Sequence, residues 1–329
     1  MRGIFATCCS CARLFLAALL AACSSSNAPP SNPPRPLYVA NFAGNSVTVY
    51  APSANGNAVP SVTIAGSSSG LNAPQGVALD GAGRLYVANY ACCPIGGSIT
   101  VFAVGATGNA VPTASITGSN TGLSQPEGIA FDRGGQLWVA NVSNNSVTAY
   151  AANATGNVTP TATIAGSNTG LSYPEGIAFD GVGRLYVANN GNSSITVYPA
   201  GATGNVTATV TISGTNTGLN APVGVALDAA GRLYVANYGT GTPSVTVYPA
   251  GASGNATPTA TIVGGNTGLD QPFGIALDAG GQIYVANAAN FSHAYRITVY
   301  TAGSTGDATP TFTIAGSNTG LNGPSYLTF

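Results

Sequence analysis

Leu37-Tyr38-Val39-Ala40-Asn41 is the first of six near-identical strings that run through the chain. Four copies are identical and two differ at one residue. They occupy residues 37–41, 85–89, 137–141, 185–189, 233–237 and 283–287. A period of about 50 residues is typical of repeat architectures, in which each unit is one supersecondary module that cannot bury its own apolar face. The spacing therefore predicts six structural units that pack against one another.

Each unit contains four short segments rich in β-branched and aromatic residues, separated by Gly, Asn, Thr and Pro. In one unit we expect strands at residues 176–180, 185–189, 194–198 and 207–212. No helical periodicity interrupts these segments. Their apolar residues do not alternate strictly, as expected where both faces of a small sheet are buried. The pattern predicts an all-β fold of four-stranded units.

The two ends of the chain indicate how these units are arranged. Four-stranded sheets placed radially make a β-propeller, which buries both sheet faces and leaves only short edges. The first unit begins directly at its second strand, Leu37, and the chain ends in residues 324–329, which align with a lone first strand. We therefore predict a six-bladed β-propeller over residues 37–329, with one blade completed by both ends of the chain.

The repeat resembles a known family. The pattern Pro-x-Gly-[Ile/Val]-Ala-[Phe/Leu]-Asp, then Leu-Tyr-Val-Ala-Asn and a Ser-Val-Thr-Val-Tyr strand, is similar to the NHL repeat and the related YVTN-type repeats. One departure is the Asn that ends the second strand, where NHL repeats often carry Asp. The resemblance implies the propeller fold but no single function, because such propellers include scaffolds, sensors, lactonases and lyases.

The N-terminus has the pattern of a secretory signal. Arg2 and Arg13 precede an apolar run over residues 14–22, which is too short to span a membrane. The run ends in Leu-Ala-Ala-Cys, which resembles the lipobox of bacterial lipoproteins. The resemblance implies a signal peptide at residues 1–22, acylation of Cys23 and, because Ser24 follows, sorting to the outer membrane. Residues 23–36 are rich in Pro and Ser and are predicted to form a disordered tether. We therefore expect a bacterial cell-envelope protein with the membrane as partner through its lipid.

Composition excludes two kinds of partner surface. Charged residues make up 5% of the chain and Lys is absent. Nucleic-acid binding and basic peripheral membrane binding both need clustered cations, so neither is expected. After cleavage and acylation only Cys92 and Cys93 remain, which provides no disulfide framework. They form either a strained bond between neighbours or two small residues of a loop.

Residues that recur in every unit are predicted to have structural roles. An Asp at the end of a first strand normally caps its own turn, and an Arg four residues later is a natural partner for it. These acids are Asp80, Asp132, Asp180, Asp228 and Asp278, and the arginines are Arg84, Arg184 and Arg232. We interpret the Asn that ends each second strand in the same way.

Function is better sought where the repeat breaks. The residue between Pro and Gly lies at the mouth of the central channel and reads, blade by blade, Gln75, Glu127, Glu175, Val223, Phe273 and Ser325. Adjacent glutamates repel unless they share a proton, which raises one pKa, or bind a cation. The two Glu-Gly pairs also resemble the metal-binding Glu-Gly of gluconolactonase-like enzymes. That resemblance implies a divalent cation, Ca²⁺ or Mg²⁺, on Glu127 and Glu175, although Val223 and Phe273 are apolar where further ligands would be needed.

Three loops between second and third strands are longer than the others and carry aromatic residues. Together with the channel mouth they form a predicted rim of Gln75, Tyr90, Tyr238, Phe273, Phe291, His293 and Tyr295. His293 is the only histidine, which excludes a histidine metal cluster. Aromatics around a polar mouth are typical of recognition surfaces. We favour a non-enzymatic scaffold that binds a peptide, glycan or protein. A metal-dependent lactonase or lyase is the alternative. A third possibility is a spacer that binds no ligand. Beyond the divalent cation no cofactor is implied.

Overall fold

The computed structural model describes residues 35–91, 97–239, 241–288 and 294–329. Cys23, Cys92, Cys93, Phe291 and His293, together with residues 1–22 and most of the predicted tether, lie outside these ranges. In the described part of the chain no helix is both long and apolar enough to cross a membrane.

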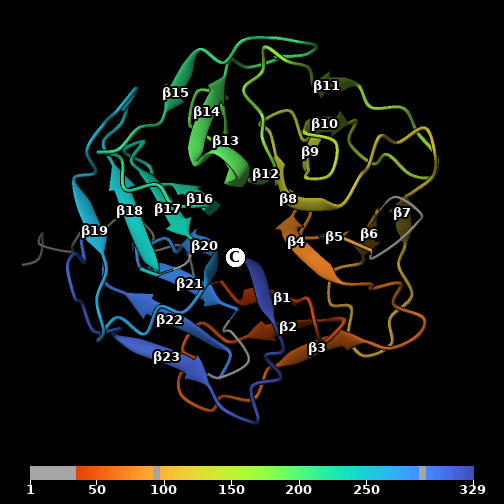
Figure 1. Ribbon diagram of the computed structural model, residues 1–329. Coiled ribbons are helices and arrows are strands. Elements are labelled where there is room, and N and C mark those ends of the chain that lie inside the picture. Colours follow the sequence, from red (N-terminus) through yellow and green to blue (C-terminus); the bar gives the residue numbers. More distant parts are fainter. Residues whose placement is uncertain (1–34, 92–96, 240, 289–293) are drawn as a thin grey trace, which may run out of the picture. The chain divides into compact units, whose positions relative to one another are not determined.

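Six four-stranded antiparallel sheets surround a central channel (Figure 1). From the channel outward, the first three sheets are β24 (Pro324–Thr328), β1 (Leu37–Asn41), β2 (Ser46–Tyr50) and β3 (Val62–Ala65); β4 (Pro74–Leu79), β5 (Leu85–Asn89), β6 (Ser98–Phe102) and β7 (Ala114–Ile116); and β8 (Pro126–Phe131), β9 (Leu137–Asn141), β10 (Ser146–Tyr150) and β11 (Ala162–Ile164).

The other three sheets have the same order. They are β12 (Pro174–Phe179), β13 (Leu185–Asn189), β14 (Ser194–Tyr198) and β15 (Val210–Ile212); β16 (Pro222–Leu227), β17 (Leu233–Asn237), β18 (Ser244–Tyr248) and β19 (Ala260–Ile262); and β20 (Pro272–Leu277), β21 (Ile283–Asn287), β22 (Arg296–Tyr300) and β23 (Phe312–Ala315). One short 3₁₀ helix, Asn190–Asn192, links β13 to β14. The predicted all-β, six-bladed propeller is confirmed.

The closing blade is also confirmed. Strand β24 pairs with β1 in antiparallel register, with Tyr38 opposite Thr328 and Val39 opposite Leu327. The last strand of the chain is therefore the innermost strand of the sheet that the first three strands form. Each inner strand is the edge strand of its own sheet and lies beside the inner strands of the two neighbouring blades, which complete the ring around the channel.

Two strands differ from the prediction. Strand β12 spans Pro174–Phe179 rather than residues 176–180, and β15 begins at Val210 rather than residue 207. The first difference arises because the inner strand carries an irregular register just after its proline, which the repeat pattern does not reveal. The second arises because the outer strand pairs with β14 only over three residues.

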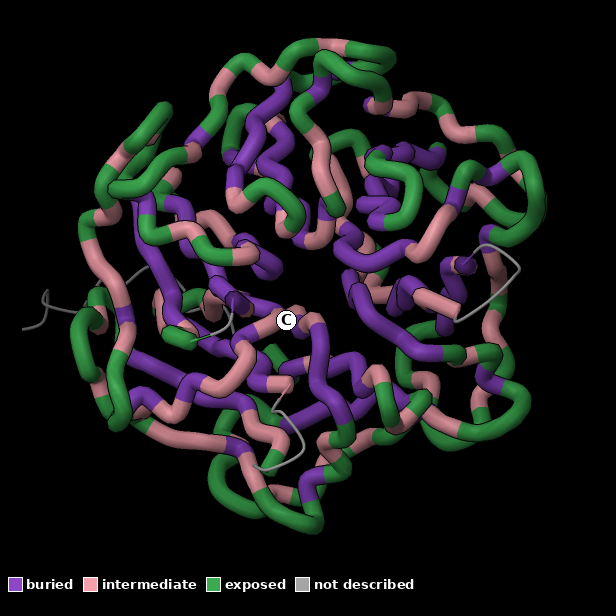
Figure 2. The backbone as a smooth tube through the Cα atoms, viewed as in Figure 1, coloured by how far each residue is buried: buried purple, intermediate pink, exposed green. Residues whose placement is uncertain are grey.

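Packing between neighbouring sheets supplies the core. The second and third strands are buried along nearly their whole length, whereas the connecting loops are exposed (Figure 2). At the end of the third strand five of the six blades place a buried tyrosine, such as Tyr150, whose hydroxyl donates a hydrogen bond to the carbonyl of Thr121, 2.6 Å away. Each such bond fixes the connection that leads into that blade.

The inner strands approach one another main chain to main chain. A Cβ placed on Gly128 or Gly176 would lie well inside 3.0 Å of a carbonyl oxygen in the next blade. These positions therefore require glycine, because any side chain would push neighbouring blades apart. The equivalent place in β24 is Tyr326, so the closing blade alone carries a side chain there.

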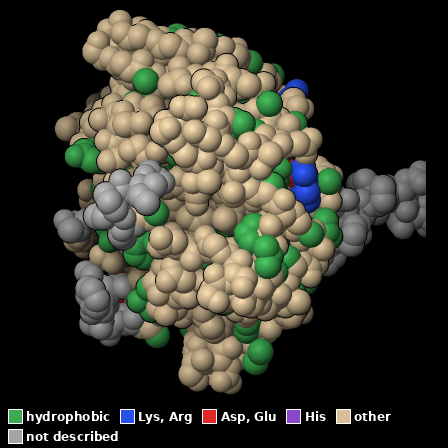
Figure 3. All heavy atoms as spheres, turned by 90° about the vertical axis from the view of Figure 1, so that its right-hand side faces the viewer, with side chains coloured by type: hydrophobic (Ala, Val, Ile, Leu, Met, Phe, Trp, Pro, Cys, Tyr) green, Lys and Arg blue, Asp and Glu red, His purple; other side chains and the backbone are tan. Residues whose placement is uncertain are grey.

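The recurrent polar residues have the structural roles predicted for them. Asp180 accepts backbone hydrogen bonds from Val182 and Arg184, and its second oxygen pairs with the Arg184 guanidinium at 2.6 Å. The side chain of Asn189 donates to Thr196 and accepts from the backbone of Ser172. These groups hold the turns and connections of their own blade together. On the face shown in Figure 3, hydrophobic and charged side chains are scattered rather than gathered in a large patch.

Candidate functional site

The ring of residues between Pro and Gly divides into two halves. Gln75, Glu127 and Glu175 stand on three successive inner strands, β4, β8 and β12, and the next three strands carry Val223, Phe273 and Ser325. Glu127 and Glu175 are the only glutamates in the chain. Glu127 is 5% exposed and Gln75 is 7% exposed, so polar side chains of these blades are buried at the channel.

A local irregularity places the glutamates in the strands. Pro126 opens β8, where its missing N–H costs no ladder bond, and pairs with Asn141 of β9. The register then shifts before Ile129 pairs with Val139, so that Glu127 lies within the irregular stretch. Such β-bulges turn a side chain away from its regular direction and are frequent beside functional sites. The same shift occurs in β12 around Glu175.

Both carboxyl groups have raised pKa values. Burial raises the pKa of Glu127 from 4.5 to about 8. Burial also raises the pKa of Glu175 well above 4.5, and the charge of Glu127 raises it further. Glu175 as a whole is partly exposed, but its Oε2, like that of Glu127, is buried and accepts no hydrogen bond from the described residues. The repulsion expected between neighbouring glutamates is therefore present.

Tyr326 is a site residue that the sequence prediction missed. Its hydroxyl is buried and has no hydrogen-bond partner among the residues that the structure describes. Burial raises the pKa of this hydroxyl well above 10, and the charges of Glu127 and Glu175 raise it further. Tyr326 lines the same cavity as Gly128, the residue that follows Glu127. The available signal was the loss of the ring glycine in the last strand, where Pro324 and Ser325 are followed by Tyr.

Two of the predicted aromatic residues, Phe273 and Tyr238, form a row of ring contacts that ends at Tyr326. The rings of Tyr238 and Phe273 meet edge to face at 5.9 Å, and those of Phe273 and Tyr326 meet in the same way at 5.4 Å. Burial raises the pKa of Tyr238, and the charge of Glu175 raises it further. The aromatic chain Tyr238, Phe273 and Tyr326 thus lies against the acidic half of the ring.

The structure does not bring the whole predicted rim together. Tyr90 packs against Phe42 of the closing blade, with ring centroids 6.2 Å apart. Tyr295 is half-buried just before β22. Phe291 and His293 lie outside the described residues. The residues shown in one cluster are therefore Glu127, Glu175, Phe273 and Tyr238, with Gln75 on the neighbouring strand and Tyr326 added.

A cavity of about 380 Å³ continues the channel from this cluster. Its wall consists of the inner strands and includes Val77, Ile129, Ile177 and Val225. Gly128 and Tyr326 also line it, so the cavity reaches the level of the ring. The polar cluster therefore adjoins a channel that is lined by apolar side chains but whose exposed wall, main chain included, is more polar than apolar.

The cluster contains few ligands for a metal. Among the described residues no group of three or more His, Cys, Asp or Glu side chains could hold an ion. Ca²⁺ takes six to eight oxygen ligands, and Mg²⁺ needs near-octahedral coordination. The two glutamates, with the Gln75 amide oxygen and the Tyr326 hydroxyl, would need several waters to complete either shell.

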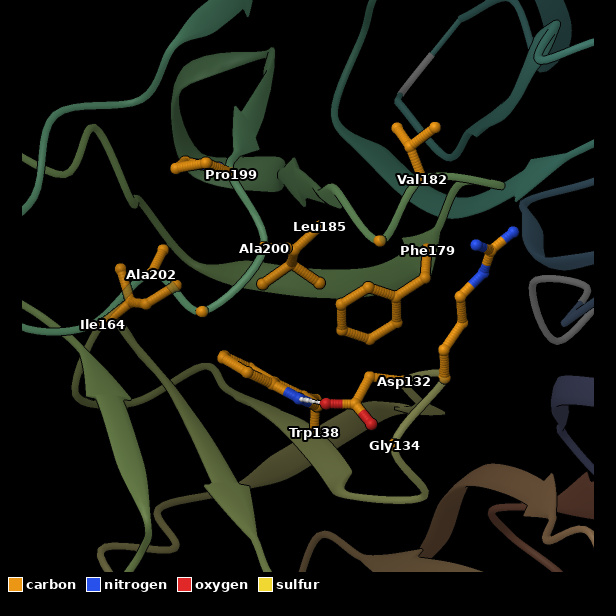
Figure 4. A pocket seen from close by; sticks show the side chains of 13 residues that line it. Asp132, Gly134, Trp138, Ile164, Phe179, Val182, Leu185, Pro199, Ala200 and Ala202 are labelled. Carbon is orange, nitrogen blue, oxygen red and sulfur yellow. Dashed lines mark hydrogen bonds between the residues drawn. The ribbon is translucent and has the colours of Figure 1, made fainter.

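A second cavity, of about 260 Å³, lies where the hairpin loops of two neighbouring blades meet (Figure 4). It is lined mainly by apolar groups, among them Phe179 and Leu185. The indole of Trp138 donates a hydrogen bond to Asp132 Oδ2 at 3.0 Å, while Asp132 Oδ1 accepts from the backbone of Gln136. Both oxygens of this carboxylate are thus used within the fold, and the channel mouth remains the stronger candidate site.

Comparisons with known proteins agree with the fold. Residues 123–150 and 171–198 match the family model described as the NHL repeat. No curated protein matches the chain.

Several solved structures share the architecture. A Bacteroides caccae protein of unknown function is 10% identical, with a TM-score of 0.63, 89% of this chain and 98% of that chain covered. The Pseudomonas aeruginosa periplasmic gluconolactonase is 18% identical, with a TM-score of 0.52 and coverage of 86% and 85%. A proposed 6-phosphogluconolactonase from Bacteroides uniformis is 13% identical, with a TM-score of 0.56 and coverage of 81% and 78%. At these identities the likeness shows the fold alone.

Proposed function

Because the chain is a β-propeller of the NHL-repeat type, we propose that it is a binding protein that takes its ligand at the mouth of the central channel. The proposal includes the lipid anchor at Cys23, which would hold the propeller at the outer membrane of a bacterium. The propeller fold is compatible with scaffolds and with enzymes alike, so only the residues of the site distinguish these functions.

One observation carries the proposal. Four buried polar atoms at the channel have no hydrogen-bond partner among the described residues: Gln75 Oε1, Glu127 Oε2, Glu175 Oε2 and Tyr326 Oη. Buried polar groups in native proteins are nearly always paired, and each one left unpaired costs about 1–3 kcal/mol. Four such atoms on adjoining elements therefore favour a site that is completed by a bound molecule.

The rim adds the surface on which a larger ligand would rest. Tyr90, Tyr238 and Tyr295 lie on or beside the three long loops, and such aromatic side chains contribute contact area at low entropic cost. A peptide, a glycan or a loop of a partner protein could place one group in the channel and spread over this rim. This extended contact is part of the proposal.

A metal-dependent lactonase or lyase is the second candidate function. A carboxyl group with a pKa of about 8, such as that of Glu127, can act as a general acid or base near neutral pH. The shared fold of the Pseudomonas aeruginosa gluconolactonase is compatible with this function. The shortage of metal ligands among the described residues weighs against it.

Thermal unfolding with divalent cations separates these candidates. The protein is heated with and without Ca²⁺, Mg²⁺, Mn²⁺ and Zn²⁺, in parallel with the Glu127→Gln, Glu175→Gln double variant. A ligand that binds only the folded state raises the melting temperature. A rise that the double variant loses would support the metal-dependent enzyme. No rise with any of these ions would reject the metal site and leave the binding protein.

A further inference from the structure

The channel mouth is chemically two-sided. Its acidic side consists of Glu127 and Glu175, with the amide of Gln75 on the adjoining strand. Its aromatic side consists of Phe273 and Tyr326, with Tyr238 packed on Phe273. Carboxylates facing aromatic rings are the two chemistries that recognise an organic cation, through charge-assisted hydrogen bonds and cation–π attraction.

The acidic side has the number of acceptors that an ammonium group needs. A primary ammonium has three N–H donors and no acceptor. Glu127 Oε2, Glu175 Oε2 and Gln75 Oε1 are buried acceptors that receive no hydrogen bond in the described structure. Gln75 and Glu127 are themselves more than nine-tenths buried. One ammonium group placed among these oxygens could satisfy all three.

No cation of the chain fills this place in the described structure. The chain contains no lysine, and Arg84, Arg184 and Arg232 are paired with the aspartates of their own hairpins. No ion pair joins either glutamate to a described arginine. Among the described residues no ion pair supplies a positive charge to the glutamates, so the site can accept one from a ligand.

We propose that the channel mouth binds the ammonium group of an organic amine, held by Glu127, Glu175 and Gln75 on one side and by the rings of Phe273 and Tyr326 on the other. This inference rests on the proposed function and names the chemical class of its ligand. The adjoining cavity of about 380 Å³, whose lining side chains include Ile129 and Ile177, has room for a short carbon chain. Rings are useful partners for an organic cation but provide no ligands for a divalent metal.

The test uses propylammonium as the probe, with 1-propanol as a neutral molecule of similar size. Binding to the full chain is measured by isothermal titration calorimetry at constant ionic strength. We expect propylammonium to bind with 1:1 stoichiometry and 1-propanol not to bind. Glu175→Gln removes one carboxylate and should weaken propylammonium binding by about tenfold or more. Phe273→Leu removes one ring and should weaken it by a smaller factor.

Asp307→Asn is the matched control because it removes one negative charge far from the channel. Asp307 accepts a backbone hydrogen bond from Asn266, and Asn157 accepts the corresponding bond from Asn120 in another blade. The control should therefore fold normally and keep propylammonium affinity within about twofold. Melting temperatures of all variants show whether a loss of binding is a loss of folding.

The outcomes separate this inference from the proposed function. Equal affinity of the parent protein and a folded Glu175→Gln variant would overturn the amine site, as would equal binding of 1-propanol. Binding of a divalent metal or a sugar at the channel, without propylammonium, would reject the amine and keep the binding protein. Absence of propylammonium binding to the folded parent protein would overturn the amine site alone, whereas the proposed function would fail only if no peptide or glycan bound at the channel mouth either.

Discussion

Replacing Glu127 with Gln should stabilise the protein at alkaline pH. Gln keeps the shape of the side chain and cannot ionise. In the folded protein burial raises the pKa of Glu127 from 4.5 to about 8, whereas the unfolded chain exposes it to water. Between these two pH values the folded state holds a proton that the unfolded state has lost. The free energy of unfolding of the parent protein therefore falls as pH rises from about 4.5 to about 8. The Glu127→Gln variant lacks this contribution to the fall.

The size of this effect follows from the pKa values. One pKa unit corresponds to about 1.4 kcal/mol, so the rise from 4.5 to about 8 corresponds to at most about 5 kcal/mol. This is a large fraction of the roughly 5–15 kcal/mol that stabilises a typical domain. Water entry and small rearrangements around the carboxylate would reduce it, so we expect a difference of a few kcal/mol at pH 8.5.

Urea unfolding at several pH values between 4.5 and 8.5 measures this difference. Parent and Glu127→Gln proteins should show equal slopes, and their midpoints should coincide within error near pH 4.5 and separate progressively toward pH 8.5, with the variant more stable. Titrating groups outside the channel mouth are common to both proteins and cancel, whereas the loss of the Glu127 charge lowers the raised pKa of Glu175 and so acts in the same direction, toward a more stable variant. A variant that is less stable at pH 8.5, or a difference that does not change with pH, would refute the reasoning.

Three further predictions concern the ring itself. Ending the chain before Pro324 removes Tyr326 and Leu327 from the closing blade, so thermal unfolding should show a loss of at least about 3 kcal/mol; an unchanged melting temperature would contradict the closure. Gly176→Ala should cost about 1–3 kcal/mol in urea unfolding because its Cβ meets a carbonyl of the next blade, whereas Gly265→Ala, with open space around it, should be nearly neutral. Arg184→Gln should cost less than about 1 kcal/mol by the same measurement, because its pair with Asp180 is partly exposed; a larger loss would assign this pair a greater role.

The architecture could be predicted because the same strand and turn pattern occurs six times in the sequence. The second strands, such as Leu185–Asn189, begin and end where the repeated string does, since Gly and Asn turns bound them on both sides. The closing blade could be predicted because the first and last units are incomplete in complementary ways. The start of β12 at Pro174 could not, because a register irregularity depends on how the inner strand meets its neighbours.

The site could be predicted only in part. The glutamate pair was visible as a break in the repeat, and equivalent positions in a closed ring necessarily adjoin one another. Tyr326 could not be predicted from the residues after proline, because it occupies the position of the ring glycine, one residue farther along the strand. The packing of Tyr90 on Phe42 could not be read from the sequence either, because side chains of different blades meet there only once the ring is closed.

The central claim is that Glu127, Glu175 and Tyr326 form one binding site at the channel mouth. A high-resolution crystal structure of the protein grown with propylammonium tests it most directly. We predict that the three side chains converge on electron density for the ammonium group, within hydrogen-bond distance of both carboxylates. Glutamate side chains turned apart, each bonded to a different group of the protein and with no density between them, would contradict the claim.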